Sequence, residues 1–258
     1  MSTRRCAALL LMTMILAACA VTSGPAGDPS KPLVLVAGAT GGTGQEIVEQ
    51  ALARGFRVRA LVRDDAKART LFADRVQYAL GDVRQPRTLR AAVRGADFVI
   101  SALGANAQRD PENSPERVDY QGVKALAEAA KAAGVKHFVL VSSMGVTHPE
   151  HELNRTLDNI LQWKLKGEQA VRATGIHYTV VRPGGLSNDP RGREGVKVMQ
   201  GDPVGADGRI SRAALAAVLV NALGRSEAYG MTFEIVGDAQ SARIDWASLY
   251  QGLKRDVG

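Results

Sequence analysis

Short apolar runs alternate with segments of helical periodicity along most of the chain. Residues 33–37 are continuously apolar, which is typical of a strand buried on both faces. Five more apolar runs predict strands at residues 56–62, 76–80, 96–101, 137–141 and 178–182. Between the strands, apolar residues recur every three or four positions, as Ile47, Val48 and Ala51 do, and this spacing predicts helices. The alternation predicts an α/β fold with a parallel, doubly wound sheet.

The pattern changes after residue 183. Seven glycines and two prolines fall between residues 184 and 209. A helical pattern then covers 212–223, an apolar run covers 232–236, and a second helical pattern covers 245–253. We interpret this part as a small C-terminal substrate cap, beginning at about residue 184, on a domain that spans 33–258. Ligands of such sheets bind outside the carboxyl ends of the strands, so we expect the loops there to line one cleft.

Three glycines follow the first predicted strand. Gly38, Gly41 and Gly44 are spaced three residues apart and lead into the first predicted helix. Glycine lets the backbone turn tightly and approach a phosphate, and a helix N-terminus offers free N–H groups to an anion. The spacing differs from the G-x-G-x-x-G of many dinucleotide-binding proteins. Because a buried strand precedes the glycines and a helix follows them, they predict a site for a dinucleotide pyrophosphate.

Short segments near the predicted strand ends share a further pattern. They are residues 38–44, 62–64, 81–83, 101–104, 119–122, 141–143 and 178–186. Together they resemble the atypical short-chain dehydrogenase/reductase family, in its NAD(P)H-binding, NmrA-like branch. The resemblance implies a Rossmann-like fold and NADP(H) as the cofactor. It assigns successive segments to the pyrophosphate, the adenine, the nicotinamide-side ribose and the nicotinamide. The implied cofactor-binding residues are Gly38, Thr40, Gly41, Gly42, Thr43, Gly44, Arg63, Asp82, Val83, Ser101, Ala102, Leu103, Gly104, Lys164, Pro183, Gly184 and Leu186.

Arg63 bears on which dinucleotide is bound. It ends the second predicted strand, nineteen residues after Gly44. NAD-binding proteins usually place an acid there for the ribose hydroxyls, whereas an arginine suits a 2′-phosphate. We therefore predict NADPH over NADH. The alternative is that Arg63 is one more solvated arginine in a basic stretch.

The catalytic pattern of the family is incomplete. Its members typically carry Tyr-x-x-x-Lys, in which the lysine lowers the tyrosine pKa so that the phenol can pass a proton to a carbonyl. Here Lys164 matches the lysine, but Ile160 occupies the tyrosine position. An aliphatic side chain cannot relay a proton, so ordinary alcohol and carbonyl oxidoreduction is disfavoured. The catalytic candidates are Lys164 and the two serines that follow the fifth strand, Ser142 and Ser143.

His148 and His151 are substitute proton donors, because histidine titrates near neutral pH. The alternative is that both belong to a surface loop. They lack a third defined ligand, so no metal site is predicted. No nucleophile elbow, Walker lysine or paired catalytic carboxylates are present either.

Two functions follow from these residues. The first is an NADPH-dependent reductase that passes a hydride to a small, flat, conjugated acceptor such as a quinone or flavin, which needs positioning more than a proton relay. The second is a non-catalytic NADPH-binding sensor or assembly factor, which the missing tyrosine supports equally.

The charge distribution suggests a third function, nucleic-acid binding, which the sequence motifs do not support. The formal charge is +7, and the stretch from Arg54 to Arg94 holds eleven basic and four acidic residues. Such an excess allows nucleic-acid binding. The stretch lacks a helix-turn-helix, zinc or aromatic-platform pattern, however, so we predict a solvated basic face and no nucleic-acid partner.

The first residues resemble an export signal. Arg4 and Arg5 precede an apolar run at 7–18, and Leu-Ala-Ala-Cys at 16–19 resembles a bacterial lipobox with Cys19 as the lipidated residue. Residues 1–19 are thus predicted to be a signal peptide, and 20–32 a tether. The predicted location is the periplasmic side of the cell envelope, with membrane attachment only through lipid at Cys19. Without a genuine signal, the protein would be cytoplasmic.

Overall fold

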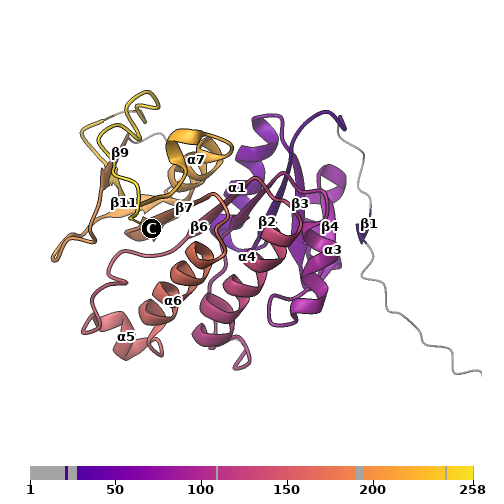
Figure 1. Cartoon of the computed structure of the whole chain (residues 1–258), viewed down its shortest axis with the longest axis horizontal. Coiled ribbons are helices and arrows are strands. Elements are labelled where there is room, and N and C mark those ends of the chain that lie inside the picture. Colours follow the sequence, from indigo (N-terminus) through magenta and orange to yellow (C-terminus); the bar gives the residue numbers. More distant parts are fainter. Residues whose placement is uncertain (1–20, 23–27, 109, 190–194, 242, 258) are drawn as a thin grey trace, which may run out of the picture.

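One sheet of nine strands runs through the part of the chain that the computed structural model describes, residues 21–22, 28–108, 110–189, 195–241 and 243–257 (Figure 1). Its order is β1-β4-β3-β2-β5-β6-β7-β11-β9. The seven inner strands are parallel: β4 (Gln77–Leu80), β3 (Arg57–Val62), β2 (Leu33–Ala37), β5 (Phe98–Ser101), β6 (His137–Val141), β7 (Tyr178–Pro183) and β11 (Met231–Asp238). The edge strands β1 (Val21–Thr22) and β9 (Gly195–Met199) pair antiparallel. The strand order reverses at β2, so β2 and β5 flank the crevice where such sheets bind ligands.

The side chains of β2 point alternately into two cores. Val34 and Val36 belong to one buried apolar cluster, and Leu35 and Ala37 belong to the other. All five residues of the strand are buried. Because successive side chains of a strand point to opposite faces, a strand with helices on both faces must be apolar throughout. This explains why residues 33–37 are continuously apolar.

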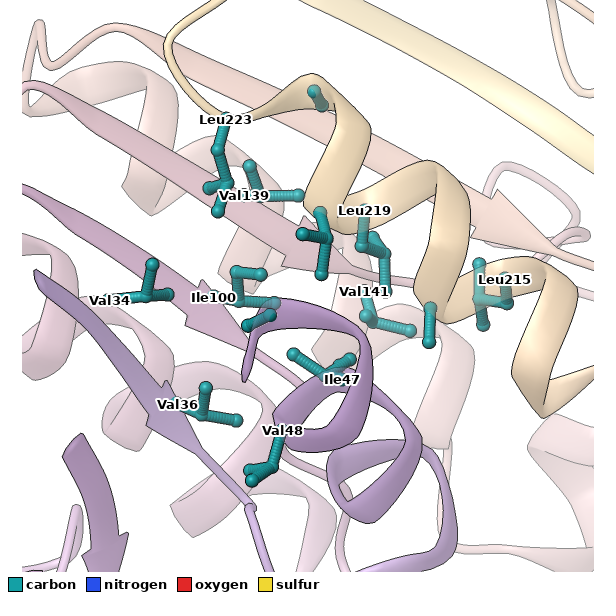
Figure 2. Close-up of a cluster of buried hydrophobic side chains, with 14 of the residues drawn as sticks. Val34, Val36, Ile47, Val48, Ile100, Val139, Val141, Leu215, Leu219 and Leu223 are labelled. Atoms are coloured by element: carbon teal, nitrogen blue, oxygen red, sulfur yellow. The ribbon is translucent and has the colours of Figure 1, made fainter. Parts of the chain in front are cut away.

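Helices cover both faces of the sheet. The first core includes residues of α1 (Gly42–Ala53), α2 (Asp65–Phe72) and α7 (Arg212–Ala222). The second includes residues of α3 (Leu89–Val93), α4 (Val123–Ala132) and α6 (Ile160–Ala173). Figure 2 shows Ile47 of α1 and Leu219 of α7 beside the strand residues Ile100 and Val141. The packing of α1 against α7 brings the glycine-rich turn close to the C-terminal part of the chain.

Shorter elements connect these layers. A π-helix, η3 (Glu116–Gly122), leads directly into α4, and α5 (Glu152–Thr156) precedes α6. The 3₁₀ turns are η1 (Ala73–Arg75), η2 (Pro86–Thr88) and η4 (Ser226–Ala228). In the C-terminal part, β8 (Gly185–Ser187) and β10 (Arg209–Ser211) form a separate parallel pair. No helix among the described residues is long and apolar enough to cross a bilayer.

The predicted fold class is confirmed: the chain is a Rossmann-like, doubly wound α/β protein with a mostly parallel sheet. The terminal helix predicted at 245–253 is wrong, because the segment forms turns. The Asp245 side chain accepts hydrogen bonds from the backbone N–H groups of Ala247 and Ser248, a local alternative to helical hydrogen bonding. The predicted signal at 1–19, including Cys19, lies outside the described residues.

Candidate functional site

The glycine-rich turn is shaped by close backbone contacts. Gly38 follows β2 with a φ of +80°, and a Cβ there would lie 2.4 Å from the carbonyl oxygen of Ala102. A Cβ on Gly44 would lie 2.0 Å from the carbonyl oxygen of Gly38. The turn closes through a 3.0 Å hydrogen bond from the Gly41 N–H to the Gly38 carbonyl. The first and third glycines of the motif are therefore required by this turn.

The turn ends at the N-terminus of α1. Gly41 is the N-cap residue, and within the described chain no side chain caps this end and no acid lies in its first turn. Such an end carries unpaired N–H groups and a partial positive charge. Together with the tight glycine cradle, it fits the pyrophosphate of a dinucleotide.

A cavity of about 340 Å³ opens beside this turn, at the carboxyl ends of β2, β3, β4 and β5. More than half of the predicted cofactor residues line it: Gly38, Thr40, Gly41, Arg63, Asp82, Val83, Ala102, Leu103 and Gly104. Val62 and Gly81, which also line the cavity, belong to segments that carry the family resemblance. The other lining residues were not predicted: Leu61, Lys67, Asn106, Asp110, Asn113 and Val118. Most of these have no motif of their own and join the site only through the fold.

The remaining predicted residues lie beside this cavity or apart from it. Gly42, Thr43 and Gly44 form the start of α1, and Ser101 is fully buried at the end of β5. Pro183, Gly184 and Leu186 lie at the β7–β8 junction and do not line the cavity. A Cβ on Gly184 would lie 2.5 Å from the Gly208 carbonyl oxygen, so this junction packs closely against the segment before β10.

Arg63 is exposed at the mouth of the cavity. Its Nη1 lies 3.4 Å from Asp110 Oδ2, and the side chain is 54% exposed. Asp110 also accepts a 3.1 Å hydrogen bond from Arg84 Nη1. An ion pair between exposed groups is weak, so an incoming phosphate can replace Asp110 as the partner of Arg63.

Asp82 lies deeper in the same wall. Its carboxylate accepts hydrogen bonds from the Arg84 side chain, the shortest at 2.7 Å. Burial raises the pKa of Asp82, but the hydrogen bonds from the side chain and backbone of Arg84 outweigh it, and the pKa falls below its ordinary value. Asp82 is therefore a charged acceptor at neutral pH.

Lys164 forms an ion pair that the sequence did not predict. Its Nζ lies 2.7 Å from Oδ1 of Asp119, whose side chain is only 1% exposed. The second oxygen of Asp119 accepts a 2.9 Å hydrogen bond from the backbone N–H of Ala105. Lys164 and Asp119 line a small space of about 10 Å³ together with Leu103 and Ser142. Leu103 also lines the large cavity, so the pair lies next to the predicted cofactor site.

The two serines after β6 differ in their surroundings. The Ser142 hydroxyl is buried and donates a 2.6 Å hydrogen bond to Oε1 of Glu168. Glu168 is itself fully buried and pairs with Arg182 at 2.7 Å. The half-buried Ser143 donates to the carbonyl of Met144 at 3.0 Å. The Ser142 hydroxyl is thus committed to an ion-pair network that sequence reasoning missed.

The two histidines organise the loop before α5. His148 Nε2 lies 2.7 Å from the Asp202 carbonyl oxygen, and His151 Nδ1 accepts the Leu153 N–H. The Asp202 carboxylate accepts hydrogen bonds from the backbone N–H groups of Gly145 and Thr147. Burial raises the pKa of Asp202, but these hydrogen bonds and the Thr147 hydroxyl lower it further than burial raises it. Among the described residues no cluster of three or more metal-ligating side chains is found.

Comparison with known proteins identifies the family. Residues 38–226 match the model of a family described as NAD(P)H-binding. The chain is 40% identical over 233 residues to an uncharacterized chloroplastic protein, At2g34460, of Arabidopsis thaliana, covering 86% of this chain and 82% of that protein. It is 33% identical over 247 residues to sanguinarine reductase of Eschscholzia californica, covering 81% and 90%. The chain therefore belongs to the Rossmann-like NAD(P)H-binding reductase family, which confirms a nicotinamide dinucleotide as the cofactor class. The preference for NADPH over NADH stays a prediction.

Solved structures share the fold. A protein of Bacillus halodurans, named as a candidate NAD-dependent epimerase/dehydratase, superposes with a TM-score of 0.74 at 23% identity. The match covers 85% of this chain and 99% of that protein. At this identity the likeness supports the architecture alone.

The predicted location is contradicted by the relatives. The Arabidopsis protein and further relatives are named as chloroplastic, which does not agree with a lipid-anchored protein of a bacterial cell envelope. The lipobox interpretation of Cys19 finds no support in the family match, which begins at residue 38. The error arose because a short apolar segment behind two arginines satisfies the pattern of a bacterial export signal without specifying a destination.

Proposed function

We propose that this protein is an NADPH-dependent reductase that transfers a hydride to a flat, conjugated acceptor such as a quinone or flavin. Membership of the NAD(P)H-binding family supports the donor, and the relative named sanguinarine reductase supports reduction of a small molecule. The acceptor class rests on the residues near Lys164.

The observation that carries this proposal is the Lys164–Asp119 pair together with isoleucine, in place of tyrosine, at position 160. Residue 160, one helical turn before Lys164, is isoleucine, so no tyrosine hydroxyl is available at that position to protonate a carbonyl oxygen. A quinone or flavin spreads the added negative charge over a conjugated system and can take its proton from water. The ammonium of Lys164, fixed at 2.7 Å from the buried Asp119, supplies a positive charge toward that anion.

Each part of the site has a proposed role. Bound NADPH supplies the hydride. The turn from Gly38 to Gly44 holds the pyrophosphate, and Arg63 binds the 2′-phosphate. Asp82 and Val83 lie beside the adenine. The nicotinamide-side ribose is positioned by Ser101 to Gly104 and by Lys164. Pro183, Gly184 and Leu186 border the nicotinamide. Ser142 and Ser143 orient the loop after β6.

The test is NADPH oxidation by the full chain with a panel of quinones and flavins. Cofactor binding is measured in the same sample by calorimetry. We expect saturable oxidation that follows the acceptor concentration. Lys164→Met should reduce its rate at least about tenfold, since loss of one electrostatic stabiliser typically costs 10²–10³ in rate. Saturating NADPH binding with no oxidation of any acceptor would contradict the proposal.

A second candidate is a non-catalytic NADPH-binding sensor or assembly factor. The capture of the Ser142 hydroxyl by Glu168 favours it, because this serine is then unable to donate to a substrate. The same experiment separates the two candidates. Stoichiometric binding without turnover supports the sensor, and turnover that depends on Lys164 supports the reductase.

A further inference from the structure

Arg212 lies against the glycine-rich turn although it comes from the other end of the chain. A Cβ built on Gly42 would lie 3.0 Å from Arg212 Nε and 3.8 Å from Cζ. Gly42 is the first residue of α1, and Arg212 is the first residue of α7. These two helices pack against each other, as Figure 2 shows. The Arg212 guanidinium therefore lies beside the N-terminus of α1, where the backbone N–H groups have no partner within the helix.

The guanidinium of Arg212 contacts a neutral side chain. Its Nη1 donates a 2.6 Å hydrogen bond to Oδ1 of Asn188, which is a neutral partner. Within the described ranges no carboxylate forms an ion pair with Arg212, and neither α1 nor α7 has an acid in its first turn. A cation at the positive end of its own helix, beside the positive end of a second one, is an unfavourable arrangement. Local rules are broken in this way where an anion is to be bound.

The partner Asn188 is held in place by the small parallel pair of strands. Ser187 of β8 and Ser211 of β10 are opposite each other in the register, so the residues that follow them, Asn188 and Arg212, lie together. The Ser211 hydroxyl accepts the Ala214 N–H and caps α7. The direction of the Arg212 side chain is thus set by its position at the start of a capped helix and by the amide of Asn188.

We propose that Arg212 binds the pyrophosphate of NADP(H), which places one cofactor ligand on the C-terminal part of the chain. The glycine turn supplies backbone N–H groups to one side of the diphosphate, and the guanidinium closes over it from the other side. Arg212 therefore contacts the pyrophosphate, which NADPH and NADH share, whereas Arg63 contacts only the 2′-phosphate of NADPH. The inference depends on cofactor binding and not on turnover, so it stands or falls separately from the reductase proposal.

The experiment compares four ligands by calorimetry or by competition against NADPH, using the full chain. NADPH, NADH and ADP-ribose contain the pyrophosphate, and adenosine 2′-monophosphate does not. Arg212→Ala is expected to weaken the first three by about tenfold to a hundredfold, as loss of a charged hydrogen bond does, and to leave adenosine 2′-monophosphate unchanged. Arg63→Ala is expected to do the reverse: it weakens NADPH and adenosine 2′-monophosphate and spares NADH and ADP-ribose.

A matched control removes an equal charge nearby. Arg209 lies three residues earlier on β10 and donates to the Leu186 carbonyl at 3.2 Å. Arg209→Ala should leave the affinities for ADP-ribose and adenosine 2′-monophosphate within about twofold, because neither ligand carries the nicotinamide that Leu186 is proposed to border. Equal losses in Arg209→Ala and Arg212→Ala, or an unchanged affinity for ADP-ribose in Arg212→Ala, would overturn the proposal.

A second variant covers the case in which Arg212→Ala does not fold. Asn188→Asp replaces the neutral partner of Arg212 with a carboxylate that competes with the pyrophosphate. It should weaken NADPH, NADH and ADP-ribose and should not affect adenosine 2′-monophosphate. In an Arg212→Lys background the effect of Asn188→Asp on these affinities should shrink. The guanidinium, which can contact the side chain at position 188 and the pyrophosphate at once, is then lost. An Asn188→Asp variant with unaltered affinity for ADP-ribose would contradict the proposed position of Arg212.

Discussion

Single residues in this protein obtain their properties from burial beside a particular partner. The Asp119 carboxylate is almost completely buried, and it accepts hydrogen bonds from the Lys164 ammonium and the Ala105 N–H. Removing one member of a buried ion pair typically costs about 3–5 kcal/mol, because the other charge is left without compensation. The position of the Lys164 ammonium is therefore fixed by its ion pair with Asp119. Lys166 on the same helix is exposed.

His137 makes the stability of the protein depend on pH. It is fully buried in β6, with Nε2 3.0 Å from the Thr179 hydroxyl and the ring 4.6 Å from the ring of Tyr229. Burial lowers its pKa from 6.5 to about 4, and the neighbouring His177 also lowers it. The unfolded chain binds a proton at this residue below pH 6.5, whereas the folded protein does not. The free energy of unfolding should therefore fall as the pH decreases from 6.5 toward 4, by about 1.4 kcal/mol per pH unit.

Denaturant unfolding between pH 7 and 4.5 measures this slope. His137→Gln, which keeps a polar side chain but does not titrate, should flatten it. His151→Gln, in the loop before α5, should retain the slope of the parent protein. If His137→Gln and the parent protein lose stability in parallel over this range, His137 is not the group responsible.

Among the elements, the contact between α6 and η3 determines the geometry beside Lys164. A Cβ on Gly167 of α6 would lie 2.3 Å from the Asp119 carbonyl oxygen in η3. The absence of a side chain thus lets the helix approach the π-helix closely enough for Lys164 to reach Asp119. A π-helix carries an extra residue in its turn and often occurs at functional sites.

Gly167→Ala should destabilise the protein, although replacing glycine by alanine within a helix usually raises the free energy of unfolding. Alanine normally stabilises a helix interior by about 1 kcal/mol relative to glycine. Here the new methyl group must displace backbone, and we expect a loss of about 1–3 kcal/mol in thermal or denaturant unfolding, as overpacking typically gives. Gln169→Ala, at an exposed position of the same helix, should be neutral or slightly stabilising. A Gly167→Ala protein as stable as the parent would show that α6 and η3 can separate freely.

The elements also show what the sequence can predict. The strands β2 to β7 were predictable because each is an apolar run ended by a glycine or polar turn, and β6 agrees with its predicted bounds. The cavity wall of Gly38, Asp82 and Ala102 followed from the rule that strand ends converge. The Lys164–Asp119 pair could not be predicted, since its members are 45 residues apart and meet only through helix packing. The strand β9 was missed because its half-exposed residues lack a clear apolar pattern.

At the scale of the whole molecule, one network of charges ties the C-terminal segment to the site. Ser142 donates to Glu168, Glu168 pairs with Arg172 and Arg182, and Arg172 Nε lies 3.1 Å from Asp256 Oδ2. The network thus joins β6, α6, β7 and the segment after β11. Networks of this kind hold separate elements in a single arrangement when each member has its partners.

Asp256 is the outermost member of this network and allows a test of its role. Its Oδ2 accepts hydrogen bonds from the Tyr178 hydroxyl at 2.9 Å and the Thr232 hydroxyl at 2.6 Å, in addition to Arg172. Asp256→Ala should lower the free energy of unfolding by about 1.5–3 kcal/mol, the range for hydrogen bonds to a charged group. Asp245→Ala, whose partners Ala247 and Ser248 are local and exposed, should cost less than about 1 kcal/mol.

The affinity for NADPH in the same variants shows how far the network acts. The cofactor cavity lies at the ends of β2 to β5, whereas Asp256 is anchored on α6, β7 and β11. Because Glu168 keeps Arg182 as a second partner, we expect Ser142 to stay in place and the NADPH dissociation constant of Asp256→Ala to change by less than about twofold. A large loss of NADPH affinity with little loss of stability would mean instead that the C-terminal segment controls the site through this network.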